Sequence, residues 1–205
     1  MEYEPEDNFL HLSSINHGAS LALVLPAWRI CRNHHLYYHI NGSIESNHEQ
    51  YAGLVNDCVK HNITKMFCTH GGVLDGFIKV LDTNNVKLPN TSVMILSFIS
   101  PKWSDTIQER RLESICSPFG CSEVCGPVFM CWMDATTVDN FNPKYLGYPK
   151  EGFYKTKVID GRIHTTLPDG REIVFDDIVK ETSDGYYFVG KNRLKKINDI
   201  DINPL

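Results

Sequence analysis

The N-terminal part of the chain alternates between apolar positions at helical spacing and short apolar runs typical of buried strands. The sequence Ser-Asn-His-Glu at residues 46–49 is a capping-box pattern, in which a hydroxyl and a carboxylate satisfy free amides at a helix start. The predicted helix that follows has one apolar face, made by Tyr51, Leu54, Val55, Cys58 and Val59. Asn62 is its predicted end, and Ile63 to Thr69 is predicted to be a short buried strand.

The same alternation continues over the next segments. A second helix is predicted after Gly71-Gly72, with apolar residues at helical spacing: Val73, Leu74, Phe77, Ile78 and Leu81. A strand over Thr91 to Phe98, a charged helix over Asp105 to Leu112 and a strand beginning at Ser114 to Cys116 complete the series. Strands and helices in this alternating order indicate a parallel α/β sheet.

The pattern changes from about Val128 onward. Asp-Gly dipeptides, which favour tight hairpin turns, separate β-rich runs and occur at Asp160-Gly161, Asp169-Gly170 and Asp184-Gly185. The predicted fold class is therefore α/β, with a parallel α/β layer followed by a small antiparallel β-roll. We expect an α/β subdomain over residues 1–127 and a β-rich subdomain over residues 128–205.

The composition narrows the classes of protein further. With 205 residues, 42% of them hydrophobic and 22% charged, the chain can bury a sizeable core. A net charge of −5 argues against a general nucleic-acid binder, which usually carries a basic face. No apolar run is long enough to span a bilayer, and the acidic start Met1 to Glu4 is unlike a signal peptide. The 7 cysteines are scattered and odd in number, so we expect a reduced, cytoplasmic protein.

Two groups of residues have side chains of the types that bind metals. The first is Cys116, Cys121, Cys125 and Cys131. These cysteines lack the paired Cys-x-x-Cys spacing of a zinc ribbon, so buried thiols are the favoured interpretation. The second is His34, His35 and His39, which we interpret as side chains on a strand and its entrance. An unrelated metal or nucleic-acid protein is therefore the weakest class of hypothesis.

The strongest motif is the segment Ser114 to Glu123, which follows the start of a predicted strand and ends in Phe-Gly-Cys-Ser-Glu. It is similar to the Tyr-Gly-x-Thr/Ser-Glu motif of the adenylate-forming superfamily, which contains acyl-CoA synthetases, luciferases and peptide-synthetase adenylation domains. The continuation Val124 to Pro127 resembles the phenylacetate-CoA ligase branch. The resemblance implies an adenine-stacking ring, a close backbone approach to the nucleotide, an α-phosphate contact and a Mg²⁺ ligand, at Phe119, Gly120, Ser122 and Glu123 respectively.

A second pair of segments resembles the adenosine-binding motifs of the same superfamily. Val174 to Val179, followed by Asp184 to Lys191, is similar to Thr-Gly-Asp followed by Asp-Gly and Gly-Arg. The resemblance implies that Asp177 accepts hydrogen bonds from the ribose hydroxyls, whereas the alternative is an exposed acid at a strand edge. Lys191 stands where an Arg usually contacts the nucleotide, and it lacks the planar fork of Arg.

Further segments extend the resemblance over most of the chain. Leu10 to Gly18 is similar to the Pro-Leu-x-His-x-x-Gly segment, which implies that His17 borders the acyl site. The alternative for His17 is a histidine at a helix start with a structural hydrogen bond. Phe141 to Gly161 resembles the stretch that leads into the β-roll, and Leu194 to Leu205 resembles the start of the family's C-terminal domain.

The sequence also departs from the family pattern in ways that bear on activity. We find no phosphate loop rich in Ser, Thr and Gly before His17, and we expect the catalytic lysine of the C-terminal domain to be missing. The Gly-Gly-Ala-Pro turn that walls the adenine is Phe98-Ile99-Ser100-Pro101 here. We expect the bulk of Phe98 and Ile99 to fill the pocket, because glycines let a backbone lie flat against a base.

Two functional hypotheses follow, and they leave open whether the chain is an enzyme. The first is a truncated AMP-binding ligase resembling an acyl-CoA synthetase. It would use ATP and Mg²⁺ to activate a carboxylate only if a partner chain supplies the phosphate loop and the lysine, with coenzyme A as a candidate acceptor. The second is a pseudoenzyme that binds a nucleotide, an acyl group or a protein. Loss of part of the parent fold would expose apolar surface, so we expect a complementary protein chain or a homo-oligomer.

Overall fold

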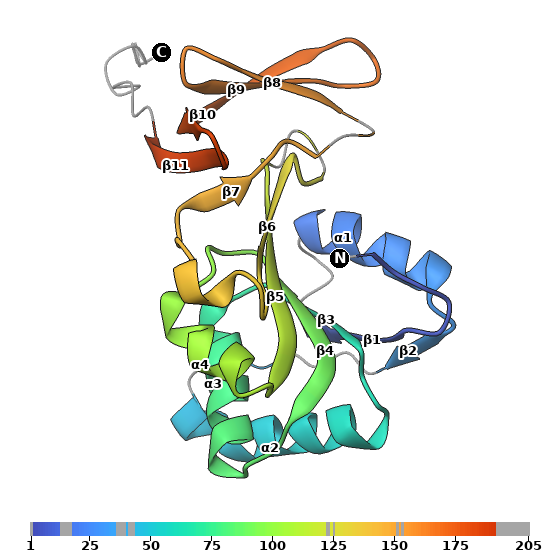
Figure 1. The fold of residues 1–205 in the computed structure, drawn as a ribbon. Coiled ribbons are helices and arrows are strands. Elements are labelled where there is room, and N and C mark those ends of the chain that lie inside the picture. The colour runs from blue at the N-terminus through green and yellow to red at the C-terminus, as the bar shows by residue number, and fades with distance from the viewer. Residues whose placement is uncertain are drawn as a thin grey trace, which may run out of the picture.

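The computed structural model describes residues 2–12, 18–35, 40, 44–121, 124, 126–150, 152 and 154–191, with the backbone alone at 18–23 and 44–46. These residues form two sheets, called sheet A and sheet B here, with helices packed on both faces of sheet A (Figure 1). No helix in this part of the chain is long and apolar enough to cross a bilayer.

Sheet A has the strand order β2-β1-β3-β4-β5-β6. Its strands are β1 (Asn8–Leu12), β2 (Asn33–His35), β3 (Lys65–Cys68), β4 (Leu88–Ile95), β5 (Leu112–Phe119) and β6 (Phe129–Met133). Strands β1 to β5 pair in parallel, and β6 adds to β5 in the antiparallel sense at the edge. The parallel layer predicted from the alternating pattern is confirmed.

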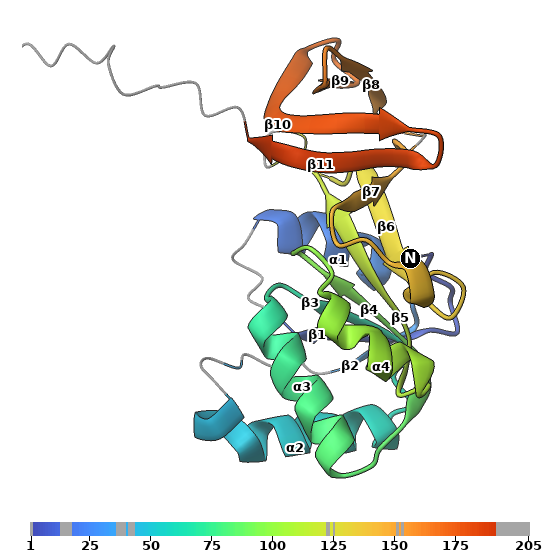
Figure 2. The ribbon, with the colours of Figure 1, turned by 60° about the vertical axis from the view of Figure 1, so that its left-hand side comes forward.

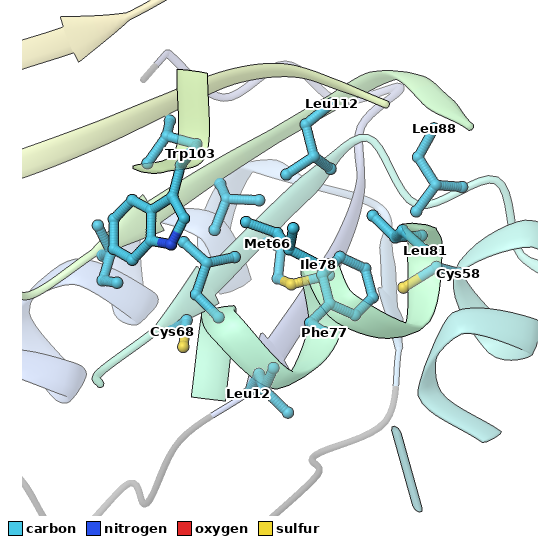
Figure 3. Packing of buried hydrophobic residues seen from close by; sticks show 14 of the residues in the cluster. Leu12, Cys58, Met66, Cys68, Phe77, Ile78, Leu81, Leu88, Trp103 and Leu112 are labelled. Carbon is cyan, nitrogen blue, oxygen red and sulfur yellow. The ribbon is translucent and has the colours of Figure 1, made fainter. Parts of the chain in front are cut away.

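The helices of this layer are α1 (Gly18–Ile30), α2 (Ile44–Lys60), α3 (Gly71–Thr83) and α4 (Ser104–Gln108), with short 3₁₀ turns η1 (Pro101–Trp103) and η2 (Val138–Asn140). Figures 1 and 2 show α1 on one face of sheet A and α2, α3 and α4 on the other. The main core lies between sheet A and α2 and α3, where the buried faces of Met66, Phe77 and Leu81 meet (Figure 3). A smaller cluster around Phe9 and Phe67 lies under α1.

The ends of the helices show where local patterns did and did not decide the structure. The backbone of Asn47 leaves the helical region (φ −134°), so the regular part of α2 begins after Asn47, inside the predicted capping box. Asn62 adopts a left-handed conformation (φ 47°) just after α2, as its predicted role as a stop requires. Helix α4 is shorter than predicted, because Arg110 is also left-handed (φ 56°) and Leu112 already belongs to β5.

Sheet B is antiparallel, with the strand order β7-β11-β10-β9-β8. Its strands are β7 (Tyr145–Gly147), β8 (Lys155–Ile159), β9 (Arg162–Thr166), β10 (Glu172–Thr182) and β11 (Gly185–Lys191). The predicted Asp-Gly turns lie between consecutive strands of this sheet, and Gly161, Gly170 and Gly185 have positive φ. The β-roll is therefore confirmed, since these glycines adopt the backbone conformation that such turns require.

A third apolar cluster joins the two sheets. Val128 and Phe129 contribute from the side of sheet A, and Ile163, Phe175 and Val179 contribute from sheet B. Phe119, at the end of β5, packs against this cluster. The division of the chain at residue 127 stays a prediction; β6, which begins at Phe129, belongs to sheet A.

Candidate functional site

The described site residues lie where the end of β5 meets sheet B. Phe119 is the last residue of β5, and Gly120 follows it. Asp177 lies on β10, and Lys191 is the last residue of the neighbouring β11. His17, Ser122 and Glu123 lie outside the described residues, so their assignments to the acyl site, the α-phosphate and Mg²⁺ stay predictions.

Phe119 belongs to a cluster of aromatic rings that also includes Phe98 and Phe188. The ring centroids of Phe98 and Phe119 are 6.2 Å apart, those of Phe98 and Phe188 are 5.1 Å apart, and those of Phe119 and Phe188 are 6.1 Å apart. Phe129 meets Phe119 edge to face at 6.3 Å. All these separations are in the range of direct aromatic contact. The ring predicted to stack on adenine therefore packs against other aromatic side chains and is half-buried.

Phe188 was not singled out by its sequence. It lies in the β-rich run Tyr186–Val189, where aromatic and β-branched residues are the ordinary composition of a strand. Only the pairing of β11 with β10 and β7 brings its ring to the end of β5.

Phe98 and Ile99, in the turn that stands in place of Gly-Gly-Ala-Pro, lie in different environments. Phe98 remains 42% exposed and contributes its ring to the aromatic cluster. Ile99 is 1% exposed and packs in the main core with Trp103. The expectation that both residues fill the pocket is therefore wrong for Ile99, because its side chain points to the helix side of sheet A. Of the two residues, only Phe98 belongs to the aromatic cluster around Phe119.

Gly120 is required by the protein's own backbone. A Cβ atom added at Gly120 would lie 2.5 Å from the carbonyl oxygen of Gly126. This distance is far inside van der Waals contact, and a backbone oxygen cannot rotate away as a side chain can. The close approach to Gly126 accounts for this glycine without a nucleotide.

Asp177 and Lys191 stand directly opposite each other across the β10–β11 pair. The Asp177 Oδ1 and Lys191 Nζ atoms are 4.0 Å apart, with 13% of the Asp177 side chain and 64% of the Lys191 side chain exposed. Burial raises the pKa of the Asp177 carboxyl above its usual value, and the nearby Lys191 ammonium opposes that rise. The arrangement is a largely buried acceptor with an exposed internal counter-ion, which differs from the strand-edge acid of the alternative interpretation.

A cavity lies away from these residues. A cavity of about 650 Å³ is lined by residues that include Lys65, Ser92, Glu113 and Trp132. None of the described predicted site residues lines it. Neither motif nor fold connects the residues of this cavity with the predicted chemistry, so the end of β5 stays the candidate site.

Cysteine, histidine and acidic side chains form no metal site in the described part of the chain. Burial raises the pKa of the Cys116 thiol to about 12 and that of the Cys131 thiol to about 11. High thiol pKa values disfavour the thiolate that binds metals. Over the described residues, no group of three or more His, Cys, Asp or Glu side chains is arranged to hold a metal ion.

Comparison with known proteins adds information on the fold. Neither the protein-family models nor the curated proteins give a match to the sequence. The fatty acyl CoA synthetase of Mycobacterium tuberculosis is similar in structure, with a TM-score of 0.69, 12% identity, and 93% of this chain and 41% of that chain covered.

Two solved complexes are also similar in structure to this chain. O-succinylbenzoate coenzyme A synthetase from Bacillus subtilis, in complex with ATP and magnesium ion, has a TM-score of 0.65, 11% identity, and coverage of 91% of this chain and 42% of that chain. McyG A-PCP complexed with phenylalanyl-adenylate has a TM-score of 0.66, 13% identity, and coverage of 93% and 40%. The chain spans less than half the length of these solved chains. At 11–13% identity the similarity concerns the fold alone, and the described residues share part of the fold of these solved enzymes, as expected from the sequence motifs.

Proposed function

We propose that this chain is part of an AMP-binding, ligase-like protein. It would activate a carboxylate with ATP where residues outside this sequence supply the phosphate loop and the catalytic lysine. The observation that supports this proposal is the position of Asp177, a largely buried carboxylate on β10 of a fold shared with adenylate-forming ligases. A carboxylate in this position can accept hydrogen bonds from both hydroxyls of a ribose.

The residues fit only part of a nucleotide. Asp177 suits the ribose, and its exposed partner Lys191 can turn toward solvent to release it. An adenine stacked on Phe119 would compete with the rings of Phe98 and Phe188, whose centroids lie 6.2 and 6.1 Å from that of Phe119. We therefore derive no catalytic step through ATP. In this proposal the α-phosphate, Mg²⁺ and acyl contacts fall to Ser122, Glu123 and His17.

A second candidate is a non-catalytic descendant that binds an acyl group or a protein. The specific observation in its favour is the contact of the Phe98 ring with Phe119, the ring that the resemblance assigns to adenine stacking. A Lys191–Asp177 pair that satisfies the carboxylate internally fits the same interpretation.

Calorimetric titration with AMP, and with ATP plus Mg²⁺, separates the candidates. The first candidate predicts weak binding, with a dissociation constant on the order of 1 mM, that Asp177→Ala weakens by about tenfold or more. Lys191→Ala is the matched control, since it removes the counter-ion and keeps the acceptor. Binding that Asp177→Ala leaves unchanged contradicts the ribose assignment. If neither the wild type nor the Lys191→Ala variant binds AMP or ATP, the result favours the second candidate.

A further inference from the structure

We propose that Phe98 determines the ligand specificity of this site by occupying the place of the purine base. The inference rests on the proposed function, because it takes the end of β5 to be the nucleotide site. It goes beyond the expectation that the replaced turn fills the pocket, because it assigns the effect to the Phe98 side chain alone. The starting observation concerns the two bulky residues of the replaced turn, Phe98 and Ile99. Ile99 is buried in the core, whereas Phe98 stays outside it and contacts Phe119.

The separations of the rings exclude a base between them. A flat base takes about 3.5 to 4.0 Å on each face for carbon–carbon contact, so two rings that enclose it must be about 7 to 8 Å apart. The centroids of Phe98 and Phe119 are 6.2 Å apart, and the ring planes are tilted by 34°. The Phe188 ring also contacts Phe98, with 5.1 Å between the two ring centroids. A purine can stack between Phe98 and Phe119 only if the Phe98 ring moves.

The backbone on both sides of Phe98 is held in place. The Ser97 carbonyl oxygen accepts a hydrogen bond of 2.7 Å from the Ser117 hydroxyl on β5. Ile99, on the other side, is buried in the main core. The turn is thus fixed to sheet A, and Phe98 can leave only by rotation of its own side chain toward solvent, where 42% of the residue already lies.

A site that must open before it binds has a lowered apparent affinity. The apparent dissociation constant equals the intrinsic constant divided by the fraction of open molecules. Removing the ring makes that fraction close to one, without adding any contact to the ligand. Phe98 therefore excludes purines in the closed arrangement and weakens their binding, whereas Asp177 and Lys191 keep their positions on sheet B.

The test is calorimetric titration of the full chain with AMP and with adenosine, using wild type, Phe98→Ala and Phe98→Leu. We expect Phe98→Ala to bind both ligands about tenfold more tightly than wild type. Phe98→Leu keeps the bulk and should remain close to wild type. Ile159→Ala is the matched control, because it removes a residue of similar exposure (40%) from the end of β8. Thermal unfolding of each variant checks that it is folded.

The outcomes separate this inference from the proposed function. Folded Phe98→Ala that binds AMP no more tightly than wild type overturns the inference, as does an equal gain in Phe98→Leu or Ile159→Ala. If Phe98→Ala gains affinity and Phe98→Ala with Asp177→Ala keeps that gain, the role of Phe98 stands and the ribose assignment to Asp177 fails. If the double variant loses the gain, both stand.

Discussion

The substitution Gly76→Ala tests the packing of α3 on α2, which supports the helix-covered face of sheet A. Gly76 lies inside α3, where alanine is intrinsically favoured over glycine by about 1 kcal/mol. From the sequence alone, the substitution should stabilise the protein. The structure predicts the opposite, because a Cβ atom at this position would lie 2.4, 2.7 and 2.8 Å from ring carbons of Tyr51.

The expected magnitude follows from these distances. Carbon atoms in contact are about 3.5 to 4.0 Å apart, so the nearest pair would overlap by about 1 Å. Tyr51 is fully buried, and its ring has no solvent into which it can move. Overpacking of this kind costs about 1 to 3 kcal/mol, and we take the upper end because the neighbour is a rigid ring. After the helix-propensity gain, we expect a net loss of about 2 kcal/mol.

Urea and thermal unfolding of wild type and variants measure this loss. For a chain of this size, about 1 kcal/mol shifts Tm by about 2 to 4 °C. Gly53→Ala in α2 is the matched control, since no atom lies within 4 Å of its added Cβ, and it should be neutral or slightly stabilising. Gly76→Ala combined with Tyr51→Leu should recover part of the loss, as a double-mutant cycle would show. A Gly76→Ala protein as stable as wild type would refute the packing argument.

Two further substitutions test polar contacts by unfolding. The Asp75 carboxylate accepts hydrogen bonds of 2.7 Å from the Trp103 indole N–H and from the Lys102 ammonium, and Trp103 is buried. Asp75→Ala should cost about 1 to 3 kcal/mol because it leaves a buried donor unpaired, whereas Lys102→Ala should cost less than about 1 kcal/mol; equal losses would contradict this ranking. Because burial raises the folded-state pKa of Asp177, its stabilising contribution is present below its ordinary pKa of 3.8 and is lost as pH rises through the folded pKa. Asp177→Asn should therefore gain stability relative to wild type at pH 7, and the gain should disappear in acid; a constant difference across pH would show that the carboxyl does not titrate as described.

The prediction of the fold from sequence succeeded where the signals are local. The apolar face of α2, the stop at Asn62 and the Asp-Gly turns of sheet B depend on a few neighbouring residues and on backbone preferences. The end of α4 was predicted less well, because residues up to Leu112 continue a polar helical pattern until the backbone of Arg110 turns left-handed.

Local sequence signals also predicted the positions of some residues of the candidate site. Phe119, Gly120 and Asp177 stand in motifs with fixed local spacing, so the sequence could place them at a strand end and on a strand. The environment of each residue is non-local. The approach of Gly126 to Gly120 depends on how the chain returns toward β6.

By itself the sequence determined the alternating α/β layer, the hairpins of the β-roll and the motif residues, because each depends on periodicity or turn chemistry within a short segment. Only the tertiary structure decided that Ile99 enters the core, that Phe98 and Phe188 cover Phe119, and that Lys191 faces Asp177. The physical reason is that these contacts join a loop after β4, the end of β5 and strand β11. Segments so far apart in sequence meet only when the sheets pair and pack, and no local pattern records which side chain then occupies the shared space.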